Sequence, residues 1–122
     1  MSRVISNPEQ FRKNVSDKFV AILKDEVISI NMEKSIYNYA IQEAGRKKII
    51  KKWANLAFVQ LYLDHFRTIY LNLKNEVLLK QVMSNEIAPQ TLVFMTHQVI
   101  VSIIAFVISY GLAFAAGRLS SR

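Results

Sequence analysis

The sequence contains no cysteine, and its 122 residues include only three glycines and two prolines. Without cysteine the chain can form no disulfide bond and no zinc site with thiolate ligands. A shortage of glycine and proline means few tight turns, because these residues supply the turn conformations that others resist. The composition therefore favours a helix-rich chain of one domain, with room for an additional segment.

Acidic residues are outnumbered by basic ones, which gives a formal net charge of +7. This excess predicts an acidic partner, which could be nucleic acid, an acidic protein surface or an anionic membrane, although ordinary solubility explains it equally well. The densest positive cluster falls at the predicted start of a long helix, where the helix dipole disfavours cations. We interpret it as a patch for nucleic acid or acidic protein, with a solvated face as the alternative. The cluster consists of Arg46, Lys47, Lys48, Lys51 and Lys52.

The sequence offers no arrangement of residues for catalysis or metal binding. His65 and His97 are isolated, so we interpret Asp64 and His65 as a surface pair on a helix. Glu33 and Glu43 are interpreted as solvated charges, and no glycine-rich phosphate loop occurs. We therefore predict a binding protein that is not an enzyme and that has no cofactor.

Hydrophobic periodicity predicts an all-α fold: a three-helix bundle, short C-terminal helices and then a long hydrophobic helix. Asn7-Pro8-Glu9 predicts the start of the first helix, which runs to about Lys24. Either Ser29 or Asn31 is expected to cap the second helix, and Gly45 to end it. The expected buried faces are Phe11, Val15, Phe19, Ile22 and Leu23 for the first helix and Ile36, Tyr37, Ala40, Ile41 and Ala44 for the second.

The third helix is predicted from near Lys47 to about Leu73, roughly 40 Å long, as the central element against which the first two pack. A short helix is expected from Glu76 to Ser84, followed by a left-handed residue at Asn85 and another short helix opened by Pro89. The expected buried face of the third helix is Phe58, Tyr62, Phe66, Ile69 and Leu73. A wider apolar stripe at helical spacing adds Ile49, Trp53, Leu56, Val59 or Gln60, Leu63 and Tyr70.

An ordered set of short motifs accompanies these helices. In chain order they are Met32-Glu33-Lys34-Ser35-Ile36-Tyr37, Tyr62, Arg67-Thr68-Ile69, Asn72-Leu73-Lys74, Leu79, Val82, Ile87-Ala88-Pro89, Leu92 and Met95-Thr96. Over roughly Phe11 to Thr96 this order resembles the central domain of the transcription elongation factor S-II (TFIIS) family. Trp53, together with Phe58 and Tyr62, resembles the versions carried by large DNA viruses.

The resemblance implies a three-helix bundle that docks on the outer face of the largest subunit of a multisubunit RNA polymerase. In the family, the long helix and the segment after it make this contact, near the jaw and funnel of the polymerase. The corresponding positions here are Arg67, Asn72 and Lys74, although Asn72 suits a structural role at a helix end equally well. Elongation factors of this family also carry a cysteine-ligated zinc ribbon with an Asp-Glu tip. This sequence has neither, so we do not expect it to stimulate transcript cleavage.

From Val99 to Gly117 the chain has no charged residue. As a helix this run would extend about 28 Å, close to the hydrocarbon thickness of a bilayer, which predicts a transmembrane helix; a buried core helix is the alternative. Predicted span residues are Val99, Ile103, Phe106, Tyr110 and Phe114. A stripe of small residues spaced four apart could let a second helix pack closely and so form an oligomer, or it could reflect only the usual composition of membrane helices. The stripe consists of Ala105, Ser109, Ala113 and Gly117.

These features predict a helical domain over residues 1–98, a hydrophobic helix over 99–117 and a basic tail over 118–122. The favoured function is a non-catalytic module that docks on RNA polymerase and tethers it to a membrane or virion. Alternatives are a membrane-anchored minor capsid or virion protein, or an integrated polymerase subunit. We expect a C-terminal membrane anchor with the N-terminal domain in the cytoplasm or inside a virion.

Overall fold

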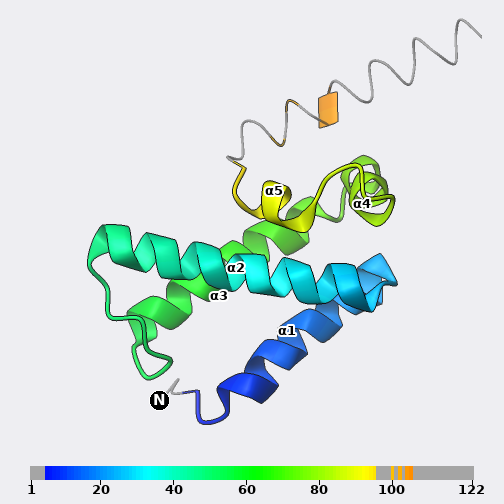
Figure 1. Cartoon of the computed structure of the whole chain (residues 1–122). Helices are drawn as coiled ribbons and strands as arrows, with labels where there is room; N and C mark the ends of the chain where they lie inside the picture. The colour runs from blue at the N-terminus through cyan, green and yellow to red at the C-terminus, as the bar shows by residue number, and fades with distance from the viewer. Residues whose placement is uncertain (1–4, 96–99, 101, 103, 106–122) are drawn as a thin grey trace, which may run out of the picture.

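The computed structural model of the chain describes residues 5–95, 100, 102, 104 and 105 (Figure 1). Within these residues the chain forms α-helices and no β-strand, as the periodicity predicts. The helices are α1 (Pro8–Leu23), α2 (Glu26–Lys47), α3 (Leu56–Asn72), α4 (Glu76–Met83) and α5 (Pro89–Val93). The predicted all-α fold is therefore confirmed for the described part of the chain.

Helix α2 is the central element. It packs against α1, α3 and α5, and α4 contacts α1 (Figure 1). It is also the longest of the labelled helices, with 22 residues against 17 in α3. The prediction that the third helix would be the longest and central element is wrong, because the chain leaves the helical conformation at Lys48 and resumes it only at Leu56.

The break between α2 and α3 is made by residues other than glycine and proline. Lys48 adopts the left-handed conformation, with φ 58°, and its N–H bonds to the carbonyls of Ala44 and Gly45. Gly45 lies inside α2, so the predicted end at Gly45 is wrong. Asn55 then caps α3, since its side chain accepts a hydrogen bond from the N–H of Ala57 at 3.1 Å.

The first turn of α2 is capped by Asp25, whose side chain accepts from the N–H of Ile28 at 2.9 Å. The predicted caps, Ser29 and Asn31, lie within the helix. The hydroxyl of Ser29 donates to the carbonyl of Asp25 at 2.6 Å, a bond available to serine in a helix interior. Asn7 caps α1 as predicted, with Pro8 as the first helical residue.

The core forms where α1, α2 and α3 meet. The five residues of the predicted buried face lie in the core cluster, whereas Leu56 of the wider predicted stripe is 51% exposed. Aromatic contacts join α1 directly to α3, with the ring of Phe19 5.4 Å from that of Phe66 and the ring of Phe11 5.7 Å from that of Tyr62. The start of α4 at Glu76, the positive φ of Asn85 and the start of α5 at Pro89 also match the prediction.

Among the described residues of the C-terminal segment, Ile100 contributes its side chain to this core. Ile100 is 1% exposed and belongs to the core cluster, and Ile104 packs against the cluster. Within the described residues, no helix is long and apolar enough to cross a membrane. Of the predicted small-residue stripe only Ala105 is described, and it is exposed. The following predicted residues lie outside the described part: Val99, Ile103, Phe106, Ser109, Tyr110, Ala113, Phe114 and Gly117.

Candidate functional site

A buried ionic contact fixes the position of α3 relative to α1 and α2. The carboxylate of Glu33, on α2, accepts hydrogen bonds from Nε and Nη2 of Arg12 at 2.7 and 3.0 Å. It also accepts one from the hydroxyl of Tyr62, on α3, at 2.8 Å. Glu33 is only 5% exposed, so the interpretation of Glu33 as a solvated charge is wrong. Burial, and then the charge of Glu33, raise the pKa of the Tyr62 phenol, which remains a hydrogen-bond donor.

An aromatic cluster anchors the beginning of α3 from the side of the preceding loop. The Trp53 ring lies 5.2 Å from those of Phe58 and Tyr62, 5.6 Å from that of Phe11 and 5.8 Å from that of Tyr37. Phe11 and Tyr37 come from α1 and α2, so this cluster joins three helices. Together with the Glu33 contact, it sets which face of α3 remains in solvent.

The outer face of α3 and the turn after it carry Arg67, Leu71 and Lys74. Their spacing of four and three residues matches one face of a helix. Arg67 and Leu71 are 62% and 63% exposed, and Lys74 is exposed beyond the helix end. Arg67 lies 3.4 Å from Asp64, and the ammonium of Lys74 lies 5.2 Å from the centre of the Tyr70 ring. This surface, called the α3 stripe below, therefore presents an apolar side chain between two cations.

Asn72 has a different environment from the α3 stripe. It is the last residue of α3, and its side-chain amide donates to the carbonyl of Thr68 at 2.7 Å. The carbonyl of Thr68 lies one turn before the end of α3, so this side-chain bond is a local contact within the last turn of the helix. Asn72 therefore makes a contact at the helix end, and its contact with polymerase stays a prediction.

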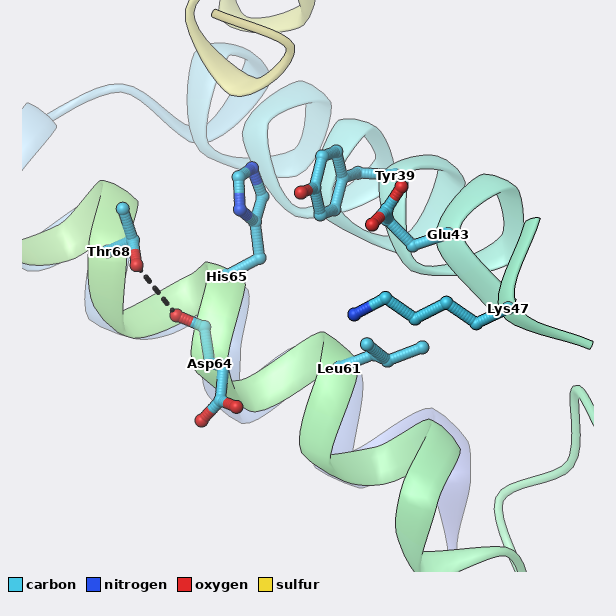
Figure 2. Close-up of a pocket in the computed structure, with 7 residues that line it drawn as sticks. All are labelled: Tyr39, Glu43, Lys47, Leu61, Asp64, His65 and Thr68. Atoms are coloured by element: carbon cyan, nitrogen blue, oxygen red, sulfur yellow. Dashed lines mark hydrogen bonds between the residues drawn. The ribbon is translucent and has the colours of Figure 1, made fainter. Parts of the chain in front are cut away.

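A pocket of about 250 Å³ lies beside the α3 stripe, between α2 and α3 (Figure 2). Inside it the ring of His65 stacks on that of Tyr39, with centres 3.6 Å apart. Nε2 of His65 lies 2.6 Å from the carbonyl of Val93, so Nε2 carries the proton and ties α3 to α5. Burial lowers the pKa of His65, so the imidazole favours its neutral form. The surface-pair interpretation holds for Asp64, which is exposed, and is wrong for His65, which is half-buried.

The polar groups of this pocket do not form a catalytic or metal-binding arrangement. Glu43 is paired with Arg46 at 2.8 Å, and the hydrogen bond from that guanidinium lowers the pKa of the Glu43 carboxyl. Figure 2 shows Lys47 extending from α2 toward Leu61 on α3. Across the described residues no group of three histidine, aspartate or glutamate side chains is placed to hold a metal ion. The pocket can accept a polar group of a partner, but it offers no nucleophile with an adjacent base.

The predicted basic patch lies at the end of α2 and in the loop that follows. Arg46 and Lys47 occupy the last turn of α2, and Lys48 is its C-cap. The predicted location at a helix start is wrong, because α2 extends past Gly45 and α3 begins only at Leu56. Cations are favourable at a helix C-terminus, so the charge cost inferred from the sequence does not exist here. All five cations are exposed.

Comparison with known families gives a match over most of the chain. Residues 7–102 match the family model described as "Transcription factor S-II (TFIIS), central domain". The matched range begins at the cap of α1 and ends two residues after the buried Ile100. Neither the search of curated proteins nor the search of solved structures gave a match.

Proposed function

The chain belongs to the transcription factor S-II (TFIIS) central-domain family, and from this we propose that it is a non-catalytic module that docks on a multisubunit RNA polymerase. We assign the contact to the α3 stripe, Arg67, Leu71 and Lys74. These residues come from the motif segment whose family counterparts bind the largest subunit of the polymerase. The observation that supports this assignment is the exposed leucine between two exposed cations.

The chemistry of the α3 stripe suits an acidic protein surface with a small apolar depression. Arg67 and Lys74 would attract carboxylates and set the orientation of the complex, whereas burial of Leu71 would supply affinity. The stripe is presented on a rigid scaffold, because the Glu33 contact and the Trp53 cluster both hold α3. A rigid surface loses little conformational entropy when it binds.

Titration of the labelled full-length chain with purified RNA polymerase from the same source tests this proposal. Reversing both charges, in the double variant Arg67→Glu/Lys74→Glu, should weaken binding by at least about tenfold, since like charges then face the acidic surface. Leu71→Ser should weaken binding with a smaller dependence on salt, because it removes apolar contact and no charge.

The matched control is Lys18→Glu/Lys34→Glu, which makes the same change in net charge with two exposed lysines of α1 and α2. We expect this variant to bind like the wild type at physiological salt. Equal losses in the two double variants would mean that the chain is attracted only by its overall charge, and would refute the assignment to α3. No binding by the wild type at low salt would refute polymerase docking altogether.

A second proposal concerns the uncharged run from Val99 to Gly117, which has the length and composition of a membrane span. We propose that it anchors the domain on a membrane, with the N-terminal part in the cytoplasm or inside a virion. In that arrangement the module either tethers polymerase or serves as a structural component. Retention of the full-length chain in membranes after alkaline carbonate extraction is the expected result, and release into the supernatant would argue for a helix packed on protein.

A further inference from the structure

We propose that the end of α2 and the loop after it form a contact site for an anionic lipid surface. This site, called the basic loop below, comprises residues 46–56. It combines five exposed cations with two exposed aliphatic side chains, Ile50 at 65% and Leu56 at 51% exposure. The inference does not depend on polymerase docking, since the basic loop and the α3 stripe are separate sets of residues.

The positive charge of the basic loop is largely available to a partner. Among the ion pairs of the described residues, Arg46 pairs with Glu43, and none includes any of the four lysines. The carboxylate of Glu43 interacts with Lys47 as well as with Arg46, and the C-terminal end of α2 adds only partial negative charge. Lysines placed close together in this way attract anionic lipid headgroups, and each contributes about fivefold to membrane affinity. The lysines are Lys47, Lys48, Lys51 and Lys52.

The loop holds Ile50 outward in a defined conformation. Its neighbour Ile49 packs against the core, and the N–H of Ile49 donates to the carbonyl of Ala44 at 2.8 Å. The side-chain amide of Asn55 donates to the carbonyl of Ile50 at 2.9 Å, and Trp53 is fixed within the aromatic cluster. Because Ile49 and Trp53 point inward, Ile50 is left to solvent. An apolar side chain held in place between lysines can enter the headgroup boundary with little loss of conformational freedom.

These features favour lipid over nucleic acid. Proteins that bind single strands stack bases on exposed aromatic rings, whereas the only ring of the basic loop, that of Trp53, is packed inward. A duplex would use the cations but would gain nothing from Ile50 and Leu56, because its outer surface is phosphate. An anionic bilayer uses both, since headgroups meet the lysines and the acyl boundary accepts the aliphatic side chains.

A local probe tests this contact directly in the full-length chain. The sequence has no cysteine, so Ile50→Cys carries a single environment-sensitive fluorophore. Val27→Cys is the matched control, because Val27 is an aliphatic residue with 69% exposure at the other end of α2. We expect a blue shift at position 50 on phosphatidylcholine vesicles that contain phosphatidylserine, no shift on pure phosphatidylcholine, and no shift at position 27. Equal shifts at both positions, or none at position 50, would overturn the proposal.

A binding measurement provides the second test, expressed as the ratio of partition constants on anionic and neutral vesicles. This ratio cancels the contribution of the uncharged run over residues 99–117, which is identical in all variants. Lys51→Gln/Lys52→Gln should lower the ratio about thirtyfold and Ile50→Ser about tenfold. The controls Lys18→Gln/Lys80→Gln and Val27→Ser should leave it unchanged. The lipid proposal is wrong if the test and control variants behave alike. It is also wrong if the chain prefers a nucleic-acid duplex to anionic vesicles and Ile50→Ser does not weaken the binding to the duplex.

Discussion

Replacing Glu33 by glutamine tests the structure directly, because the structure buries a residue interpreted from the sequence as a solvated charge. In the structure Glu33 is 5% exposed and accepts three hydrogen bonds, two from Arg12 and one from Tyr62. Glu33→Gln keeps the volume of the side chain, but it removes the charge and turns one acceptor oxygen into a donor. One N–H of the Arg12 guanidinium then faces an N–H of the amide.

The expected cost follows from the charge-assisted bonds that are lost. A hydrogen bond to a charged group contributes about 1.5–3 kcal/mol, and Arg12 can recover part of this from water because its side chain is 28% exposed. We therefore expect Glu33→Gln to lower the free energy of unfolding by about 2 kcal/mol. For a domain of this size that lowers Tm by roughly 10 °C. Tyr62→Phe, which removes one bond and leaves the Arg12 pair, should cost about 1.5 kcal/mol.

Urea unfolding followed by the fluorescence of Trp53, the single tryptophan of the chain, measures both changes. This probe suits the question because its ring lies 5.2 Å from that of Tyr62. The matched control is Glu43→Gln, on the same helix, where the partner Arg46 is 68% exposed and solvent screens the pair, so the effect on the free energy of unfolding should be much smaller. If Glu33→Gln and Glu43→Gln have the same effect, the buried contact does not stabilise the fold and the reasoning is refuted.

Three further perturbations test other parts of the structure. Burial lowers the pKa of His65 from an unfolded value of about 6.5. The contribution of His65 to stability is therefore complete above about pH 6.5 and is lost as the pH falls through the folded-state pKa. Urea unfolding between about pH 7.5 and 5 should show this decline in the wild type and a weaker one in His65→Gln. Asp25→Ala should lower the free energy of unfolding by about 1 kcal/mol, because it removes the cap of α2, and Asn31→Ala should leave it unchanged. Equal effects of the two variants would contradict the observed start of α2. Lys24→Gly should raise the free energy of unfolding by about 1 kcal/mol, because Lys24 has φ 58° and glycine adopts that conformation without strain. A destabilised variant would contradict this backbone conformation.

The elements that the sequence predicts well are those in which periodicity and capping residues agree. On α1, Asn7 and Pro8 mark the start, and on α5 Pro89 does the same. Five residues of the core face of the third helix follow from apolar spacings of three and four, although Leu56, at a similar spacing, is exposed. Phe58 and Leu73 define the two ends of that face. In these places local preference and tertiary packing favour the same conformation.

The sequence does not reveal the break between α2 and α3, because its left-handed residue is a lysine. Gly45 is the residue that capping statistics favour, yet α2 continues to Lys47 and Lys48 takes the positive φ. The apolar pattern also continues through the loop, since Ile49 and Trp53 face the core while the backbone is not helical. Periodicity reports which side chains are buried and not how the backbone reaches them, so a helical spacing across a loop misleads.

The burial of Glu33 is hard to predict for a related reason, although the sequence contains a signal for it. It lies four residues after Ser29 and three before Ile36, both of which are buried, so it falls on the inner face of α2. A carboxylate on such a face requires partners from other helices, and no spacing within α2 identifies Arg12 and Tyr62. The same holds for the pocket between α2 and α3, where no spacing identifies the stacking of His65 on Tyr39. Arg67 and Lys74 stay predictions.

The burial of Ile100 places a condition on the membrane proposal. A span that began at Val99 would put Ile100 in lipid, whereas Ile100 is 1% exposed within the core of the helical domain and Ile104 packs against that core. If both stay with the domain, the uncharged run that remains, residues 105–117, would extend about 20 Å as a helix, short of the hydrocarbon thickness of about 30 Å. Full insertion therefore requires that these two isoleucines leave the domain and that lipid replace the core contacts. Ile100→Ser separates the two states, because it should destabilise the domain in water by about 2 kcal/mol and should matter little once the segment has inserted at the headgroup boundary.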